Sequence, residues 1–190
     1  MLGIPAASAS AEFVVLGAGP AGCAVATVLA RAGRDVLLVD AHSSPPSVIG
    51  ESLLPFGTRV LELMGVSMEG FQIKRGAIFS RVDEVVRFDF SESARPTWSH
   101  AWEVKRDDLD ARLRASAAEA GARFAWAAAS RFEQGVLQTD HGPIQAGFFV
   151  DAAGRRKFLA RQLGDVENPP VLRNAAQYGR FRGSRTRGPE

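Results

Sequence analysis

The sequence predicts an α/β fold with a parallel sheet and a partial antiparallel β region. Two short apolar runs, residues 12–16 and 35–40, are typical of buried parallel strands. A glycine-rich turn and a helical pattern separate them, and the whole unit has the length of a βαβ motif, about 30 residues. Alternation of apolar and polar residues, clearest over 84–90, indicates that the antiparallel region lies between about 76 and 104.

The first helix is predicted from residue 23 to a glycine at 33. A second helix is predicted from apolar residues that recur at helical spacing, and Gly65 is its natural end. These apolar residues are Phe56, Val60, Leu63 and Met64. Because proline is tolerated only in the first turn, the helix begins close to Pro55. Ser52 and Leu54 are both candidates for its N-cap, and the sequence does not decide between them.

A third helix is predicted from Asp107 to Gly121, with acidic residues in its first turns, where the helix dipole favours them. Asp107, Asp108 and Asp110 are therefore interpreted as solvated acids. Short strands are predicted at 123–127, 130–139 and 144–150, followed by a helix over 157–164. After residue 165, proline, asparagine, glycine and arginine dominate. The chain is therefore divided into a domain over 1–165 and a segment over 166–190, which is either a disordered tail or the start of a further C-terminal half.

Composition and charge exclude several classes of partner. The net charge is +2, so nothing favours nucleic acid or an anionic membrane surface. No window approaches the roughly 18 uninterrupted apolar residues of a transmembrane helix. The single cysteine, Cys23, cannot form an internal disulfide, which favours a reducing cytoplasm, and it is interpreted as a small packing residue. His42, His100 and His141 lack metal-ligand spacing, so no metal site is predicted.

Glycines at 17, 19 and 22 fit a dinucleotide-binding pattern, because they follow a strand and open a helix. The first permits a tight turn, the second lets the backbone approach a pyrophosphate, and the third lets helix pack on strand. Free N–H groups at the helix start would bind phosphate with the aid of the helix dipole. Asp40 ends the second strand at the expected offset of ~20 residues and would accept hydrogen bonds from ribose hydroxyls. These features predict a Rossmann-like domain, with FAD and NAD both open at this point.

Four landmarks follow one another along the chain: GAGPAG at 17–22, GESLLP at 50–55, VKRDDLDARL at 104–113 and DAAG at 151–154. With them the sequence resembles the flavin-dependent halogenases, and most closely the branch that acts on phenolic or pyrrolic groups, often carrier-bound. That family lies within the FAD monooxygenases resembling p-hydroxybenzoate hydroxylase. The resemblance covers most of residues 12–165 and implies FAD as the cofactor.

The resemblance implies that the glycine turn, the end of the second strand, the GESLLP segment, the start of the third helix and the DAAG element each contact FAD. The implied cofactor-binding residues are Gly17, Ala18, Gly19, Pro20, Ala21, Gly22, Asp40, Ile49, Gly50, Glu51, Ser52, Arg106, Asp151 and Gly154. Ala153 replaces the serine that is usual in the family. Arg155 and Arg156, the next positions, are less typical of it.

Lys74 is the residue that the resemblance marks for catalysis. It lies in GFQIKRGAIF, at 70–79, a stretch similar to the one that carries the family's lysine. In the family, reduced FAD and O₂ oxidise chloride, and the lysine amine captures or orients the resulting hypochlorous acid. A lysine amine can lose its proton when desolvated, whereas arginine rarely does, so the two are not interchangeable here. The alternative interpretation of Lys74 is a surface lysine at the start of a strand.

The family's Trp-x-Trp-x-Ile-Pro element and its substrate-binding C-terminal half have no counterpart in this sequence. We therefore expect the N-terminal portion of a larger halogenase, acting on a small aromatic substrate that is free or carrier-protein-bound. No second glycine fingerprint for NAD(P)H is present, so reduced flavin would come from a separate flavin reductase. Two alternatives stay open: an FAD-dependent monooxygenase or other oxidoreductase of the same fold, and a non-catalytic flavin-binding fragment.

Overall fold

The computed structural model describes residues 9–45, 49–94 and 99–164, together with the single residues Val166, Gly179 and Gly183. Apart from those three, the segment over 166–190 lies outside the described residues. Its separation from a domain over 1–165 therefore stays a prediction.

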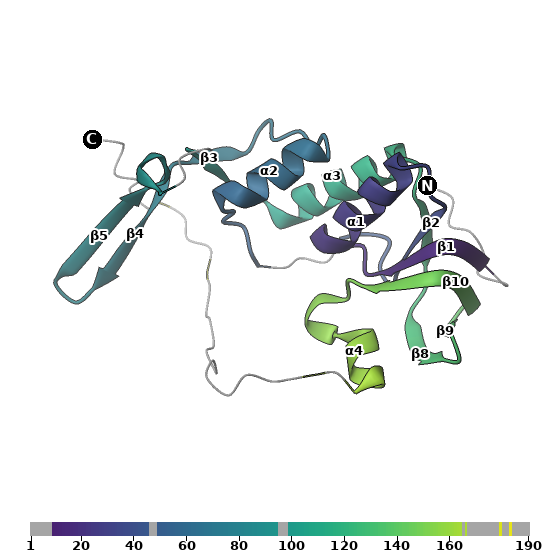
Figure 1. Cartoon of the computed structure of the whole chain (residues 1–190). Helices are drawn as coiled ribbons and strands as arrows, with labels where there is room; N and C mark the ends of the chain where they lie inside the picture. The colour runs from purple at the N-terminus through teal and green to yellow at the C-terminus, as the bar shows by residue number, and fades with distance from the viewer. Residues whose placement is uncertain are drawn as a thin grey trace.

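The main sheet has six strands (Figure 1). In order across the sheet they are β7 (Arg123–Trp126), β2 (Val36–Asp40), β1 (Ala9–Leu16), β10 (Gly142–Asp151), β9 (Val136–Thr139) and β8 (Ala129–Glu133). The first four run parallel, and β9 and β8 continue the sheet antiparallel. The prediction of an α/β fold with a mainly parallel sheet is confirmed.

The first four residues of β2 and the last three residues of β1 are buried on both faces, which is why their sequences are continuous apolar runs. On β2, Leu38 packs into the cluster beneath the helices and Leu37 into the cluster on the opposite face, and both are fully buried. Helices α1 (Pro20–Arg31) and α3 (Arg106–Glu119) cover the first face, and the short α4 (Phe158–Leu163) lies on the other (Figure 1). This layering places the carboxyl ends of the strands beside the start of α1.

A second, smaller β region lies beyond α2 (Pro55–Leu63). β3 (Gln72–Lys74) pairs antiparallel with β6 (Ala101–Glu103), and residues 51–53 pair with the other edge of β6. The partial antiparallel region predicted between about 76 and 104 is therefore present, and it begins a few residues earlier. GESLLP thus contributes an extended edge segment before α2 begins.

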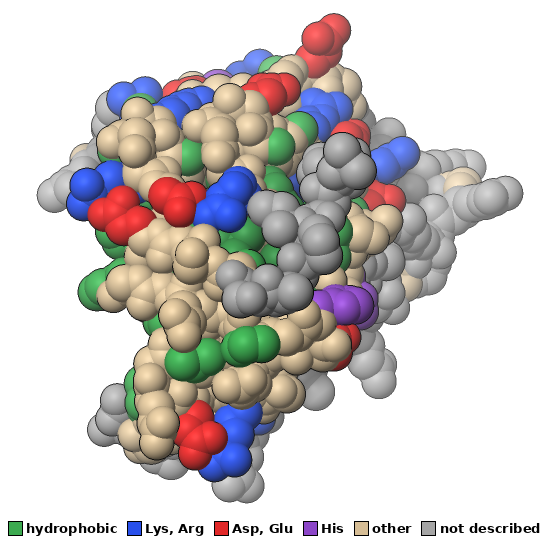
Figure 2. All heavy atoms as spheres, turned by 90° about the vertical axis from the view of Figure 1, so that its right-hand side faces the viewer, with side chains coloured by type: hydrophobic (Ala, Val, Ile, Leu, Met, Phe, Trp, Pro, Cys, Tyr) green, Lys and Arg blue, Asp and Glu red, His purple; other side chains and the backbone are tan. Residues whose placement is uncertain are grey.

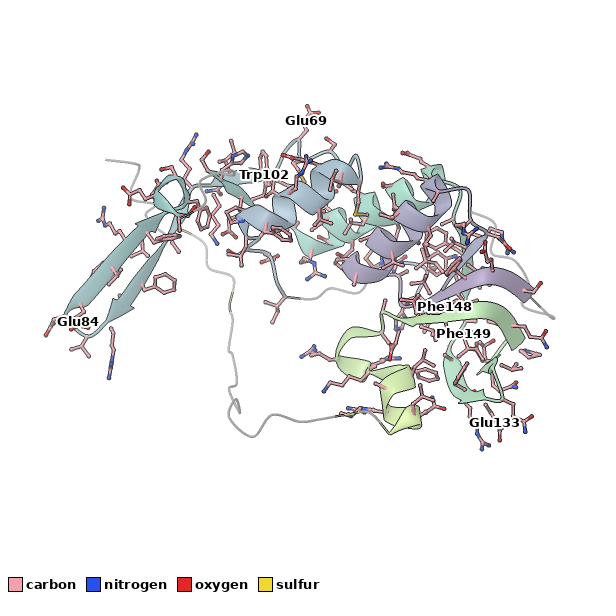
Figure 3. All side chains as sticks on the ribbon, in the orientation of Figure 1. Glu69, Glu84, Trp102, Glu133, Phe148 and Phe149 are labelled. Atoms are coloured by element: carbon pink, nitrogen blue, oxygen red, sulfur yellow. The ribbon has the colours of Figure 1, made fainter. Side chains whose placement is uncertain are left out.

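A hairpin projects from this second region (Figures 1 and 3). It consists of β4 (Gly76–Arg81) and β5 (Glu84–Asp89), and the short 3₁₀ helix η1 (Phe90–Glu92) follows it. Every residue of β5 is exposed, and Glu84 lies near the tip, away from the helices. The hairpin therefore contributes little to the cores around the main sheet.

Two local details were left open or misjudged from the sequence. Leu54, not Ser52, occupies the N-cap of α2, and its side chain makes no capping hydrogen bond. The strand predicted over 130–139 is two strands, β8 and β9, joined by a tight turn. In that turn Gln134 and Gly135 have φ values of 51° and 77°, the left-handed conformation that two-residue hairpin turns require.

The surface mixes charges of both signs. Figure 2 shows acidic and basic side chains interspersed over one face of the molecule, and the ion pair between Arg123 and Asp35, at 2.7 Å, is partly solvent-exposed. None of the helices in the described ranges is long and apolar enough to cross a membrane. Those ranges also contain no group of three or more histidine, cysteine, aspartate or glutamate side chains placed to hold a metal ion.

Candidate functional site

The turn between β1 and α1 uses three glycines for three steric reasons. Gly17 has a φ of +100°, and a Cβ there would lie 2.5 Å from the carbonyl oxygen of Ala152. A Cβ on Gly22 would overlap the carbonyl oxygen of Gly17. At Gly19, by contrast, no atom lies within 4 Å of a Cβ position. The turn is therefore tight on its inner side and open beside Gly19, where a pyrophosphate would approach the backbone.

A cleft of about 540 Å³ passes the start of α1. Gly19 is the N-cap of this helix without a side-chain hydrogen bond, so N–H groups of the first turn can bind an anion. The lining comes from the glycine turn, the end of β2, the strand β7–β8 connection and the 3₁₀ helix η2 (Gly154–Arg156). It includes Gly17, Gly19, Pro20, Ala21, Asp40, His42, Ala127, Ala129, Gly154, Arg155 and Arg156. The cleft lies at the carboxyl ends of parallel strands, where such sheets bind nucleotides.

Asp40 lines this cleft and uses both carboxylate oxygens to hold its wall. Oδ2 accepts a hydrogen bond from the Ala18 N–H at 2.8 Å, and Oδ1 accepts one from the His42 N–H at 2.9 Å. A carboxylate offers about four lone-pair sites. The predicted ribose acid therefore retains acceptor capacity for ribose hydroxyls.

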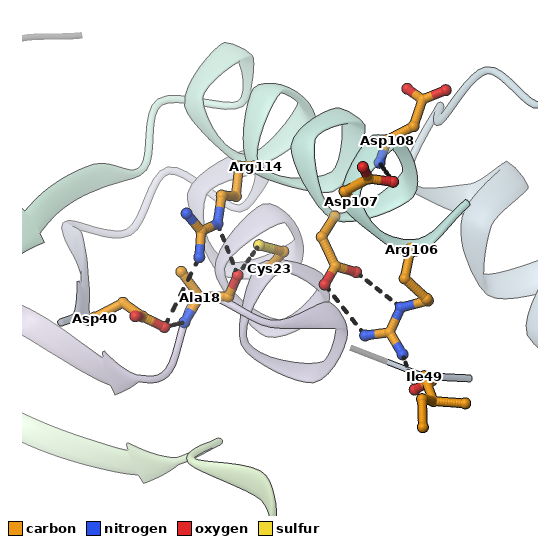
Figure 4. A network of polar contacts seen from close by, with 9 residues as sticks. Ala18, Cys23, Asp40, Ile49, Arg106, Asp107, Asp108 and Arg114 are labelled. Carbon is orange, nitrogen blue, oxygen red and sulfur yellow. Dashed lines mark hydrogen bonds and ion pairs between the residues drawn. The ribbon is translucent and has the colours of Figure 1, made fainter. Parts of the chain in front are cut away.

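Arg114 on α3 ties the glycine turn to the loop after β2, and the sequence analysis missed it (Figure 4). Its Nε donates to the carbonyl oxygen of Ala18 at 3.0 Å, as Figure 4 shows. Its Nη1 donates to the carbonyl oxygens of His42 and Ser43, both at 2.9 Å. Nη2 lies 3.9 Å from Oδ2 of Asp40. Arg114 is only 4% exposed. A buried cation is tolerated only with such partners, so this residue fixes the two walls of the cleft relative to each other.

The role of Arg114 could have been predicted from its position on the apolar face of α3. Leu109, Leu113 and Ala117 recur at helical spacing and are buried, and Asp110 and Arg114 share that face. Charged residues are almost never buried without partners. Two of them, four positions apart on an apolar stripe, therefore indicate an internal polar network.

Asp110 was predicted to be a solvated acid, and this is wrong because it is 3% exposed. Arg106 donates to both of its carboxylate oxygens at 3.2 Å. Nη1 of Arg106 also donates to the carbonyl oxygen of Ile49 at 3.3 Å, and a Cβ on Gly50 would lie 2.8 Å from that nitrogen. The start of α3 is thus bonded to the residues immediately before Glu51.

A second hollow, of about 320 Å³, adjoins the cleft at the start of α1. Apolar side chains of α1, α2 and α3 form most of its lining, with Gly50 and Arg106 among them. Pro20 and Ala21 line both spaces. The glycine turn, Gly50 and Arg106, which are distant in sequence, therefore border two neighbouring spaces.

Asp151 and Gly154 shape the turn after β10. Oδ1 of Asp151 accepts from the Ala153 N–H at 3.1 Å, and Oδ2 accepts from the N–H groups of Leu159 and Ala160 at 2.8 and 3.3 Å. Gly154, with φ of 58°, lines the cleft. In this structure Asp151 orders the turn and the start of α4, while Gly154 lines the cleft at the start of α1.

Lys74 and the GESLLP segment come together although 22 residues separate Lys74 from Ser52. Nζ of Lys74 donates to Oγ of Ser52 at 2.6 Å and to the carbonyl oxygen of Leu53 at 3.4 Å. It lies 4.0 Å from the Glu103 carboxylate and 5.4 Å from the centroid of the Phe90 ring. Only 15% of the Lys74 side chain is exposed. Its amine is therefore held by defined partners instead of extending into solvent.

The backbone of GESLLP explains how Ser52 reaches this position. The Glu51 carbonyl oxygen accepts from the Val104 N–H at 2.7 Å, and the Leu53 N–H donates to the Trp102 carbonyl oxygen at 2.9 Å. This pairing holds the segment extended along β6. Ser52 and Lys74 line neither the cleft nor the adjoining hollow, so the structure joins them to each other and not to the glycine turn.

Cys23 lies on the inner side of α1 and is fully buried. Its Sγ donates to the carbonyl oxygen of Ala18 at 3.5 Å. Burial raises the pKa of the thiol to about 12. The group therefore stays protonated at neutral pH, as expected of a packing residue.

The fold and the cleft together define an α/β protein of the dinucleotide-binding class. The family model for tryptophan halogenases matches residues 12–166. The chain therefore belongs to the tryptophan halogenase family. The halogenases among its relatives are flavin-dependent oxidoreductases.

Two curated relatives illustrate the range of similar proteins. A tryptophan 2-halogenase from Chondromyces crocatus is 31% identical over 192 residues, which cover 92% of this chain and 36% of the relative. A menaquinone reductase from Mycobacterium tuberculosis is 33% identical over 166 residues, which cover 82% of this chain and 40% of the relative. The chain thus spans 36% to 40% of the length of these proteins.

Solved structures of a dehydrogenase and of a halogenase are likewise similar to this chain over part of their length. A flavoprotein/dehydrogenase from Cytophaga hutchinsonii superposes with a TM-score of 0.72 at 32% identity, covering 82% of this chain and 42% of that one. The myxobacterial chondrochloren halogenase, an FAD-dependent halogenase, gives a TM-score of 0.69 at 26% identity, covering 78% and 38%. These comparisons confirm the resemblance and, for the family, FAD as the cofactor. The open space beside Gly19 and the uncapped start of α1 fit its pyrophosphate.

Proposed function

We propose that this chain is the FAD-binding portion of a flavin-dependent halogenase, which uses reduced FAD, O₂ and halide to halogenate a small aromatic ring. The proposed ring is phenolic or pyrrolic, free or bound to a carrier protein, and a separate flavin reductase supplies the reduced flavin. The observation that carries the proposal is the 2.6 Å hydrogen bond from Lys74 to Ser52. It joins the lysine marked for catalysis to the GESLLP segment.

Each part of the chain has a defined task in this proposal. The glycine turn and the start of α1 bind the pyrophosphate, and Asp40 binds the ribose. FAD, when bound and reduced, supplies the oxidation of halide by O₂. Asp110 and the Ile49 carbonyl orient Arg106 at the edge of the segment that faces the flavin.

Lys74 provides the amine that takes the halogen. Ser52 and the Leu53 carbonyl hold two of its N–H directions, so the nitrogen lone pair of the neutral amine has a fixed orientation. A nitrogen–halogen bond forms as the oxygen–halogen bond of hypohalous acid breaks, and the hydroxide leaves as water with one proton of the amine. The halogen then passes to an electron-rich ring, and the proton that it displaces from the ring returns to the amine nitrogen. The burial of this side chain supports the role, because only 15% of it is exposed and its nitrogen is held at a defined position beside the GESLLP segment.

A second candidate is an FAD-dependent oxidoreductase in which the lysine takes no part in chemistry. The relatives favour it by one specific observation: the menaquinone reductase and the flavoprotein/dehydrogenase match this chain at 33% and 32% identity. In that case the cleft would bind FAD in the same way, and a quinone or another acceptor would replace halide and aromatic ring.

The deciding experiment supplies reduced FAD, O₂, bromide and a phenolic acceptor to the protein and detects halogenated product by mass spectrometry. In the complete enzyme of which this chain is proposed to be a portion, the wild type should form product, and Lys74→Ala should form none while binding FAD with unchanged affinity. Lys105→Ala is the matched control, because Lys105 is an exposed lysine just before α3, and it should retain the activity.

Halogenated product from Lys74→Ala would remove this lysine from the mechanism. If the wild type yields no product but oxidises reduced FAD with a quinone, and Lys74→Ala does the same, the oxidoreductase candidate replaces the halogenase. Comparing wild type with Lys74→Ala, each with a phenol and with a quinone, therefore separates the two candidate functions.

A further inference from the structure

Two arginines of the cleft have no counter-ion among the residues that the structure describes. Arg155 and Arg156 lie in η2, directly after the DAAG element, and both are exposed and line the cleft. Within the described residues, neither side chain makes a hydrogen bond or an ion pair. Other arginines of the chain do: Arg106, for example, has Asp110, and Arg123 has Asp35.

The acids near the cleft are already occupied by other donors. Asp151, which lies closest in sequence, accepts hydrogen bonds from three backbone N–H groups. Asp40 accepts two, and Arg114 faces it at 3.9 Å. Arg155 and Arg156 therefore add positive charge to the lining of the cleft that these acids do not neutralise.

The position of η2 relates these charges to the glycine turn. A Cβ on Gly17 would lie 3.2 Å from Cα of Ala153, the residue before η2. The turn that carries the arginines therefore packs directly on the turn that opens beside Gly19. Both line the same cleft.

We propose that Arg155 and Arg156 capture the pyrophosphate of FAD: their charge steers the dinucleotide into the cleft, and their guanidinium groups then hold its phosphates together with the N–H groups of α1. Arginine binds phosphate through paired, charge-assisted hydrogen bonds. Like charges along a cleft with low-dielectric walls raise the association rate of an oppositely charged ligand by factors of roughly 10 to 1,000. Such capture rests on the proposed function in one respect, since it matters most where reduced flavin arrives by diffusion from a separate reductase.

The test is the association rate of FAD with the protein, followed by flavin fluorescence in a stopped-flow instrument at several salt concentrations. The double variant Arg155→Gln/Arg156→Gln should associate roughly tenfold more slowly than wild type at low salt. The difference should shrink towards 1 M salt, where the Debye length is about 3 Å. Arg155→Lys/Arg156→Lys keeps the charge and should keep the rate, while the bound FAD should dissociate faster because paired hydrogen bonding is lost.

The matched control is Arg131→Gln/Arg161→Gln, which removes the same charge from exposed positions that do not line the cleft. Its association rate should stay within about twofold of wild type, because the effect of charge falls off with the Debye length. Equal rates and equal salt dependence in wild type and Arg155→Gln/Arg156→Gln would overturn the proposal, as would a wild type that does not bind FAD. The assay contains no halide and no acceptor, so a failure of halogenation in the Lys74 experiment leaves its result intact.

Discussion

At the residue scale, Gly19 and Gly22 have opposite reasons for being glycine. Gly19 has φ of −84° and ψ of −174°, a conformation open to any residue, and the space for a side chain is empty. At Gly22 a Cβ would overlap the carbonyl oxygen of Gly17. The first glycine therefore serves a ligand, and the second serves the packing of helix on turn.

Gly19→Val should consequently fold and lose FAD, because its side chain would occupy the place of the pyrophosphate. We expect an unchanged unfolding temperature and no binding in a flavin fluorescence titration. Gly22→Val is the comparison and should lose the folded state itself. A Gly19→Val protein with wild-type affinity for FAD would place the pyrophosphate elsewhere.

Arg114 also stabilises the fold, in addition to joining the two walls of the cleft. Arg114→Met would leave the Ala18, His42 and Ser43 carbonyl oxygens without their donor, at a cost of roughly 3 kcal/mol in the free energy of unfolding. Urea denaturation of wild type and Arg114→Met measures this difference in the free energy of unfolding. Arg131→Met removes an exposed arginine and should change the value by less than about 0.5 kcal/mol; equal effects would mean that the Arg114 network contributes little.

Cys23 gives the molecule a pH dependence at high pH. Its pKa is raised by burial from 9.0 to about 12, so above pH 9 the unfolded state loses a proton that the folded state keeps. The group's contribution to stability is therefore complete below pH 9 and is lost as the pH rises, by ~1.4 kcal/mol per unit. Urea titrations at each pH should show that Cys23→Ala loses less unfolding free energy than wild type between pH 9 and 10. Equal losses in the two proteins would contradict the raised pKa of Cys23.

At the element scale, the hairpin of β4 and β5 closes with an unfavourable residue. Val82 has φ of 52° and is 93% exposed. A β-branched residue is strained in the left-handed region by roughly 1–2 kcal/mol, whereas asparagine is common there in two-residue turns.

Val82→Asn should stabilise the hairpin by about 1 kcal/mol. Amide hydrogen exchange in β4 and β5 should slow about fivefold, since 1 kcal/mol corresponds to that factor. Gln134→Asn alters the comparable turn between β8 and β9 and should leave exchange in β4 and β5 unchanged. Faster exchange in Val82→Asn would show that the valine is favoured by contacts that the turn geometry does not reveal.

The elements that the sequence predicted well are those fixed by local pattern. The strand, glycine turn, helix and strand from β1 to β2 follow from apolar runs and from the steric needs of glycine. The position of Ser52 could not be predicted from local pattern. Its place beside β6 depends on pairing with Glu103, about 50 residues later. Asp110 and Arg114 were misjudged or missed for the same reason: charge suggests solvent, and only the packing of α3 shows the network. Lys74 was predicted from resemblance, and its contact with Ser52 is visible only in three dimensions.

At the scale of the whole molecule, two buried clusters hold the fold together, one on each face of the main sheet. The hairpin belongs to neither. Its register pairs Phe79 with Val86 and Ala77 with Phe88, so one face of the ribbon is apolar, and the three larger side chains are 42% to 64% exposed. Apolar surface of this kind drives association between proteins.

The double variant Phe79→Ser/Val86→Thr should therefore separate the stability of the chain from its tendency to associate. Its unfolding temperature should match wild type, because neither side chain packs into the clusters around the sheet. Binding of a hydrophobic dye and light scattering at high concentration should both fall, since the exposed apolar face is what each of them detects. Leu37→Ala provides the contrast: it deletes a fully buried side chain, costs about 2–5 kcal/mol, and should increase dye binding. A hairpin variant that unfolds as readily as Leu37→Ala would place the hairpin within the cooperative core of the molecule.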